Sequence, residues 1–150
     1  MLQFDEYKVK LNNLAPTLEE LGQALDLEGA ERELDMLQAE SAADGFWNNL
    51  EKAQKVQQRI KTLQNKVDKQ HKRCQEWDDL MALCEMGNEF EDESLVPELE
   101  EGFAALEADM EAAACDYEKL GELVNEKEAA QAELDALYER WEQLSEEAEG

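Results

Sequence analysis

The sequence predicts an all-α protein, an elongated helical bundle built on a long antiparallel coiled-coil hairpin. Apolar residues recur at intervals of three and four along most of the 150 residues, as they do on the buried face of a helix. The chain holds only seven glycines and two prolines, so few positions interrupt these patterns. No segment alternates apolar and polar residues as a half-buried strand does.

Two helices are predicted before residue 45. The apolar spacing indicates a first helix over residues 4–25. Pro16 lies inside it, lacks a backbone donor and clashes with the carbonyl four residues earlier, so we expect a break or kink just before it. After a turn at Asp26–Gly29, a short helix is expected to reach about Ser41. Gly45 then supplies the left-handed conformation common after a helix end.

Two longer helices form the predicted hairpin. The heptad pattern over residues 50–85 indicates a nearly unbroken helix that ends at Gly87-Asn88. Asp92 or Ser94 is the expected N-cap of the next helix. Pro97 fits the first turn of that helix, where its missing donor is not needed. Apolar residues then keep the same spacing almost to the end of the chain.

The last helix would be longer than its hairpin partner, so its C-terminal apolar residues need a cover. Either the chain breaks near Cys115-Asp116 or Gly121 and folds back, or another chain, including a second copy in a homo-oligomer, covers them. We expect a continuous or gently bent helix. The predicted domains are residues 1–112 and an additional helix over residues 113–150, which extends the hairpin or folds back on it.

Charge is distributed unevenly along this acidic chain, whose formal net charge is −25. Residues 50–73 hold eight of the 14 basic side chains and only two acidic ones. Because a negative surface repels phosphate, only this stretch could contact nucleic acid. The alternative is a solvated helix face whose lysines pair with acids on a neighbouring helix. The candidate contact residues are Lys52, Lys55, Arg59, Lys61, Lys66, Lys69, Lys72 and Arg73.

The sequence offers little for catalysis. His71 is the only histidine, and we expect it to face solvent from a basic helical stretch. His71 and Cys74 have the spacing of two metal ligands, but no second pair completes a site. We therefore predict no enzyme activity, cofactor, metal or small-molecule substrate. No apolar run approaches the length of a membrane span and no secretory signal is evident, so we expect a cytoplasmic protein without membrane contact.

Four aromatic residues are predicted structural anchors. Trp77 and Trp141 lie on apolar stripes and are expected to serve as core or interface anchors. Gly45 turns the chain, and Phe46 and Trp47 are then expected to bury their rings where the short helix meets the hairpin. Direct contact with a partner is the alternative for the Phe46-Trp47 pair.

Six segments of the chain match one known family: Leu18–Gly22, Leu25-Asp26, Gly45-Phe46-Trp47, Leu50–Val56, Gln58–Lys61 and Asp92–Leu99. By these segments, residues 1–112 resemble the N-terminal helical domain of bacterial peptide chain release factor 2. The ending differs from that family. Residues Asp116–Leu120 and Leu134–Glu142 resemble the C-terminal helix of F-type ATP-binding cassette translation factors.

The first resemblance implies a non-catalytic helical domain of a translation termination factor. In that family the helical domain reaches toward the stalk base of the large ribosomal subunit, so the implied partner is the ribosome. The chain contains no Gly-Gly-Gln and no codon-reading tripeptide, so peptidyl-tRNA hydrolysis and stop-codon reading are not expected of it. The alternative function is a structural or adaptor coiled coil that pairs with itself or with another protein.

Overall fold

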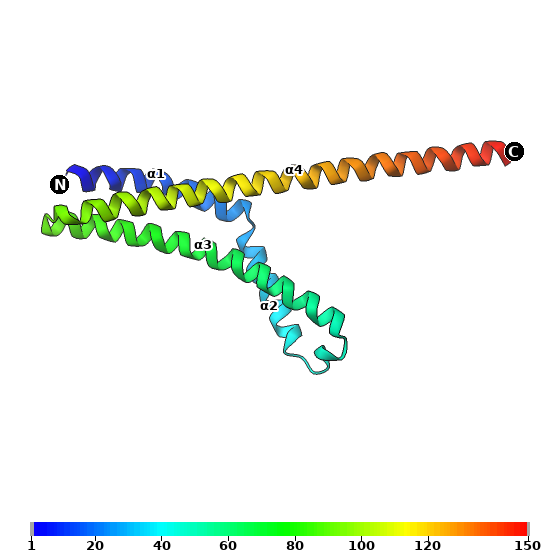
Figure 1. Ribbon diagram of the computed structural model, residues 1–150, viewed down its shortest axis with the longest axis horizontal. Helices are drawn as coiled ribbons and strands as arrows, with labels where there is room; N and C mark the ends of the chain where they lie inside the picture. Colours follow the sequence, from blue (N-terminus) through cyan, green and yellow to red (C-terminus); the bar gives the residue numbers. More distant parts are fainter. Residues whose placement is uncertain (1, 150) are drawn as a thin grey trace. The chain divides into compact units, whose positions relative to one another are not determined.

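The computed structural model describes residues 2–149, with the side chains of Val124 and Glu149 left aside. These residues are all-α and contain no strand, which confirms the all-α part of the prediction (Figure 1). The elements are α1 (Leu2–Ala24), α2 (Leu27–Ser41), the 3₁₀ turn η1 (Phe46–Asn48), α3 (Leu50–Phe90), the 3₁₀ turn η2 (Glu93–Leu95) and α4 (Val96–Glu149). The chain forms two compact units, one up to Glu111 and one from Ala112 onward.

Helix α3 is the central element of the first unit. Helices α1 and α2 pack along it one after the other, drawn in blue and cyan beside the green α3 in Figure 1. Residues 96–111 of α4 pack in the same unit, and the rings of Tyr7 and Phe103 meet edge to face at 5.5 Å. The core side chains from α1 and α4 are Phe4, Leu11, Leu18, Leu21, Leu99, Leu106 and Met110.

The contact between α2 and α3 has its own apolar cluster. Its buried members are Ala30 and Leu34 from α2 and Leu63 and Val67 from α3. These residues are spaced three or four apart on each helix, so they lie on one face and meet across the contact. The cluster fixes which side of α3 remains open to solvent.

Short polar residues define the turns between helices. Asp26 adopts a left-handed conformation (φ 49°), and its side chain accepts a hydrogen bond from the Gly29 N–H at 3.3 Å, which begins α2. The predicted turn is therefore shorter than Asp26–Gly29: it lies at Leu25-Asp26, and α2 already begins at Leu27. Gly45 has φ 81°, a value that glycine adopts without strain, as the sequence predicts. Asn49 then caps α3 through the Lys52 N–H at 3.2 Å.

The predicted break at Pro16 is wrong, because α1 continues through it from Leu2 to Ala24. Leu11 and Leu18, on either side of Pro16, are both buried. The carbonyl of Leu11 also accepts a hydrogen bond from Trp77 Nε1 at 2.7 Å. Packing against α3 therefore outweighs the local cost of a proline inside a helix.

The predicted helix end at Gly87-Asn88 is also wrong, because α3 runs on to Phe90. Gly87 is buried, and a Cβ built at this position would lie 2.4 Å from Phe4 Cε1. Glycine is therefore needed at residue 87 for the close approach of the Phe4 ring. The helix ends instead at Glu91, whose φ of 50° is left-handed and whose N–H bonds to the Gly87 carbonyl.

The start of α4 follows the sequence prediction at Pro97, which lies in the first turn of the helix. The predicted N-cap is wrong: Asp92 accepts a hydrogen bond from the Ser94 N–H at 3.0 Å, but it caps η2, and α4 begins at Val96. A single helix is assigned over Val96–Glu149, as expected. In the second unit, the large apolar side chains of residues 117–144 that the structure describes are exposed.

Within residues 2–149 no helix combines the length and apolar character needed to cross a membrane.

Candidate functional site

The basic residues of α3, numbered 52–73, begin in the first turn of the helix and continue along its contact with α2. Leu63, Val67 and Gln70 turn toward the core of the first unit. The surrounding basic side chains therefore divide into three groups: those facing α2, those facing solvent and one directed inward. Their contacts decide which of them can reach a phosphate.

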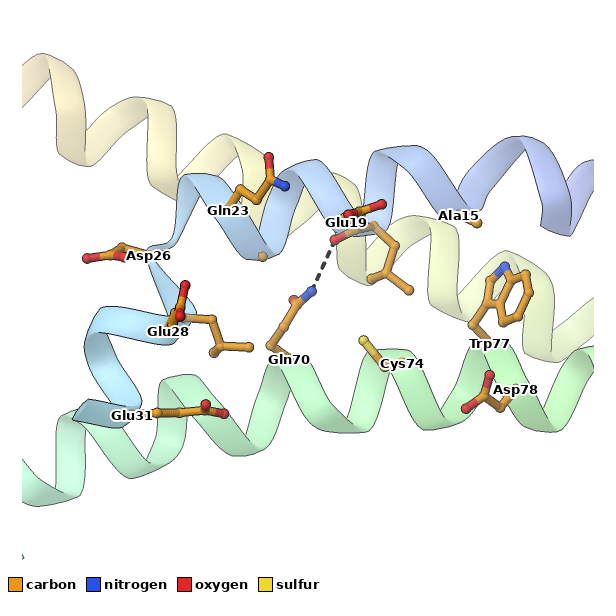
Figure 2. A pocket seen from close by; sticks show the side chains of 13 residues that line it. Ala15, Glu19, Gln23, Asp26, Glu28, Glu31, Gln70, Cys74, Trp77 and Asp78 are labelled. Carbon is orange, nitrogen blue, oxygen red and sulfur yellow. Dashed lines mark hydrogen bonds between the residues drawn. The ribbon is translucent and has the colours of Figure 1, made fainter. Parts of the chain in front are cut away.

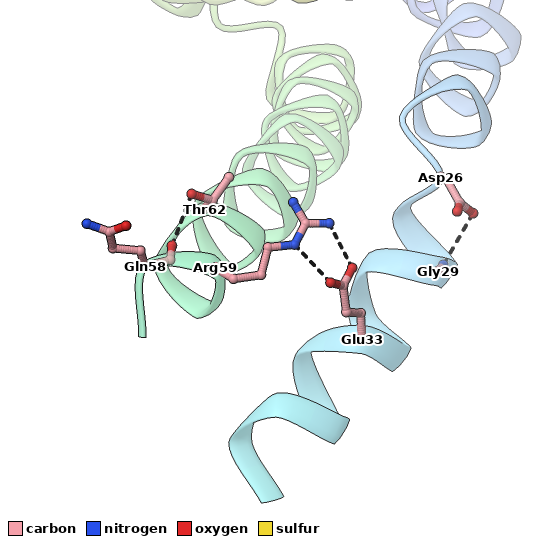
Figure 3. Close-up of polar contacts among 6 residues, drawn as sticks. All are labelled: Asp26, Gly29, Glu33, Gln58, Arg59 and Thr62. Atoms are coloured by element: carbon pink, nitrogen blue, oxygen red, sulfur yellow. Dashed lines mark hydrogen bonds and ion pairs between the residues drawn. The ribbon is translucent and has the colours of Figure 1, made fainter. Parts of the chain in front are cut away.

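Arg59 is committed to an acidic residue of α2. Its Nε and Nη2 atoms donate to the two carboxylate oxygens of Glu33, each at 2.8 Å (Figure 3). The two parallel bonds hold a planar guanidinium against a planar carboxylate. The hydrogen bond lowers the pKa of Glu33 and raises the pKa of Arg59. Figure 3 also shows the Asp26–Gly29 cap at the start of α2.

Other pairs follow the same pattern. Lys52 lies 3.4 Å from Glu40 of α2, and His71 lies 3.0 Å from Glu31 of α2. Two further lysines have acidic neighbours on α3 itself, Lys55 with Glu51 at 3.7 Å and Lys72 with Glu76 at 3.9 Å. These same-helix pairs are long and exposed, so they hold the lysines only weakly.

Arg73 does not belong to the exposed surface that the sequence predicts for it. Its residue is only 6% exposed, and its Nε donates to Asp109 of α4 at 2.7 Å. Its Nη1 donates to Gln70 Oε1 at 3.1 Å, and Gln70 Nε2 donates to the Leu18 carbonyl at 3.1 Å. Arg73 thus joins α1, α3 and α4 inside the first unit and is unavailable to a phosphate.

Three candidates remain without a close acidic partner. Lys61, Lys66 and Lys69 form no ion pair within 4.0 Å in the part of the chain that the structure describes. Lys61 and Lys69 are exposed, whereas Lys66 is half-buried. Lys61 and Lys72 are eleven residues apart, about three helical turns, so they project from the same side. We call Lys61, Lys69 and Lys72 the outer basic face of α3.

A groove of about 640 Å³ lies among α1, α2 and α3 of the first unit. Figure 2 shows Gln70, Cys74 and Trp77 of α3 directed toward it. Its lining includes no lysine or arginine. It includes five carboxylates: Glu19, Asp26, Glu28, Glu31 and Asp78. The groove therefore repels phosphate, and a contact with nucleic acid would have to use the outer basic face instead.

The predicted anchors occupy different environments. Trp77 is half-buried and bonds to the Leu11 carbonyl, as a core residue would. Trp47 is 60% exposed, so the expectation that its ring is buried is wrong. Phe46 and Trp47 instead pack edge to face on each other at 5.2 Å within η1. Trp141 is 66% exposed in the second unit, which rules out a core position for it there.

The sequence indicated that the basic residues of α3 could pair with acids on a neighbouring helix, but it did not identify those acids. Glu33, Glu40 and Asp109 stand far from their partners in the chain. Gln70 is a polar residue at an apolar position of the heptad pattern, yet it is 2% exposed and bonds to both Arg73 and α1. Among residues 2–149, no group of three or more histidines, cysteines or carboxylates is placed to hold a metal ion.

Similarity to known proteins agrees with both resemblances seen in the sequence. Residues 89–146 match the family described as the ABC transporter C-terminal domain. The chain is 31% identical over 94 residues to peptide chain release factor 2 of Clostridium perfringens strain SM101, which covers 63% of this chain and 26% of the relative. The chain is therefore similar both to an ABC transporter C-terminal domain and to peptide chain release factor 2. With peptide chain release factor 2 of Streptomyces avermitilis the identity is 31% over 97 residues, covering 65% of this chain and 26% of that protein. The chain spans about a quarter of the length of the curated relatives it matches.

Proposed function

We propose that the chain is a non-catalytic helical domain of a translation termination factor of the release factor 2 type, which docks on the ribosome near the stalk base of the large subunit. The observation that carries the proposal is the 31% identity to release factor 2 over most of the chain. The whole chain contains no Gly-Gly-Gln. The proposal therefore assigns neither hydrolysis nor codon reading to these residues, and it places them in the cytoplasm.

The outer basic face of α3 is the proposed contact with ribosomal RNA. Lys61, Lys69 and Lys72 are exposed and have no strong intramolecular partner, so their ammonium groups can approach backbone phosphates. Such contacts position a protein without reading sequence. Arg59 and Lys52 would first have to leave Glu33 and Glu40, and they contribute less.

Co-sedimentation with ribosomes tests this proposal. We expect the chain to pellet with ribosomes at about 50 mM salt and to remain in the supernatant at about 200 mM, because each phosphate contact releases counterions. K61E/K69E should abolish pelleting at the lower salt. K10E/R32E removes the same charge from positions outside the basic stretch and should leave it unchanged. Absence of ribosome binding by the unmodified chain at about 50 mM salt would contradict the proposal.

A second candidate function is a structural or adaptor coiled coil. The observation that favours it is the row of exposed apolar side chains in the second unit, including Leu137 at 65% and Trp141 at 66% exposure. A contiguous apolar row of this kind marks an interaction surface. Sedimentation equilibrium tests the candidate, and a monomer whose Trp141 is protected from quenchers would remove the need for a partner.

A further inference from the structure

The second unit carries a regular apolar row, which we call the α4 seam. Its six large members are 45–66% exposed: Leu120, Leu123, Leu134, Leu137, Trp141 and Leu144. Lys127 and Ala130 fill the gap, and the whole row is then spaced alternately by three and four residues. This is the a/d pattern of a helix that packs against another helix in a coiled coil.

One flank of the α4 seam carries charges in an ordered sequence. The residues directly before the a positions are Lys119, Glu126, Glu133, Arg140 and Glu147. Their signs read plus, minus, minus, plus, minus. The other flank is neutral at Gln131, Tyr138 and Ser145. Charges at such flanking positions select the partner and its direction.

We propose that the α4 seam pairs antiparallel with the α4 seam of a second copy, in one register. The inference rests on the adaptor function proposed above. In an antiparallel pair, the charged flank of one helix faces the charged flank of the other. Lys119 then meets the partner's Glu147 and Glu126 meets the partner's Arg140. Two-fold symmetry repeats both attractions, leaving Glu133 beside the partner's Glu133 as the single like-charge contact.

The same register matches the apolar layers. Leu120 packs on the partner's Leu144, and Leu123 packs on the partner's Trp141. The small Ala130 meets the partner's Leu134, so a small side chain faces a large one at the two central layers. Lys127 lays its aliphatic stem on the partner's Leu137 and extends its ammonium to solvent. Every seam position has a partner within the pair.

Other alignments lose these attractions. A shift of one heptad in one direction sets Lys119 against the partner's Arg140 and Glu126 against the partner's Glu133. A shift in the other direction sets Glu126 against the partner's Glu147, a repulsion that offsets the attraction it creates between Glu133 and the partner's Arg140. A parallel pair would place the charged flank beside the neutral flank, where the order of the signs has no effect. The charge order thus selects one alignment.

The positions of the few basic residues in the second unit support pairing with a second copy of the same acidic helix. Residues 112–150 contain twelve acidic and three basic side chains. All three basic residues, Lys119, Lys127 and Arg140, lie in or beside the α4 seam. The outer positions carry acids without bases. The positive charge is therefore placed where it offsets the mutual repulsion of two acidic helices.

Sedimentation equilibrium of the full chain in the micromolar range tests the pairing. We expect a dimer that R140E weakens roughly tenfold, because two attractions become two repulsions. E126R/R140E exchanges the two charges and should restore the dimer to within about threefold of the unmodified chain. E139R/R140E has the same net charge, but its new arginine lies on the outer face, so the dimer should stay weak.

A second pair of variants tests the seam itself. L137E should abolish the dimer, whereas A136E, one position away and outside the seam, should not. Circular dichroism would confirm that each variant stays helical. A chain that is monomeric throughout the range, or a dimer indifferent to the charge exchange, would overturn the pairing. Ribosome co-sedimentation of the same samples separates the proposals, since a monomer that still pellets with ribosomes contradicts the pairing alone.

Discussion

Arg73 and Asp109 are joined across α3 and α4 by a 2.7 Å hydrogen bond, although they stand 36 residues apart. The guanidinium is nearly enclosed, while the Asp109 side chain is 52% exposed. Gln70 satisfies a second donor of Arg73 from within α3. The pair therefore fixes the first part of α4 against α3. Among the described residues, Arg73 has no other acidic partner within 4.0 Å.

D109A should destabilise the first unit. Removing the carboxylate leaves a buried guanidinium without its counter-charge, and water reaches only the Asp109 side of the pair, so we expect a loss of about 1–2 kcal/mol in the free energy of unfolding. Urea unfolding measures it. E107A, an exposed acid on the same helix, should change the value by less than about 0.5 kcal/mol. Equal effects of the two variants would contradict the role given to Arg73.

G87A should also be destabilising, despite the better helix propensity of alanine. The added Cβ would lie 2.4 Å from Phe4 Cε1, so the ring or the helix has to move, at a cost of about 1–3 kcal/mol. The matched control is G121A, where no atom lies within 4 Å of the added Cβ. That variant should gain helicity and about 0.5–1 kcal/mol. Thermal unfolding followed by circular dichroism distinguishes them, and a stabilising G87A would refute the close contact.

The Arg59–Glu33 pair should give stability a defined pH dependence. The pKa of Glu33 is lowered in the folded state, chiefly by the hydrogen bond from Arg59. The stabilisation is therefore present above the unfolded-state pKa and is lost as the pH falls through the folded-state pKa. An NMR titration should show the Glu33 pKa rising toward its ordinary value in R59A. The same pKa in both proteins would show that the pair does not form in solution.

The cysteines should differ sharply in reactivity. Cys84 is 0% exposed, and burial raises the pKa of its thiol, so little thiolate forms and reagents cannot reach it. Cys115 is exposed. A thiol reagent at neutral pH should label Cys115 promptly and Cys84 only at the rate of unfolding. Prompt labelling of Cys84 in folded C74S/C115S would contradict the buried position.

Periodicity alone predicted the all-α class and most helix bounds, because an apolar face repeats within the sequence that forms the helix. Pro16 and Gly87 misled the prediction for a common reason. Proline and glycine usually end or break a helix, but tertiary packing overrides this local tendency here. Burial of Leu11 and Leu18 keeps α1 helical through Pro16, and the close approach of Phe4 requires Gly87 inside α3. Neither contact leaves a mark in the neighbouring sequence.

For the candidate site, the sequence predicted where basic residues are concentrated but not which of them are free to bind a phosphate. The concentration of bases over residues 50–73 is visible in the sequence, but their availability depends on acids from other helices. Glu33 neutralises Arg59, and Asp109 draws Arg73 inward. The exposure of Trp47 was missed because a large aromatic residue usually indicates burial, whereas here it packs mainly on Phe46.

The proline within α1 has a consequence for the order in which this molecule takes shape during synthesis. A peptide of α1 alone lacks one helical hydrogen bond and the indole donor of Trp77, so it has little reason to coil. That donor belongs to a segment translated much later. Residues 2–24 precede α3 in the chain, so we expect them to become ordered only after α3 has been synthesised and provides the surface they pack against.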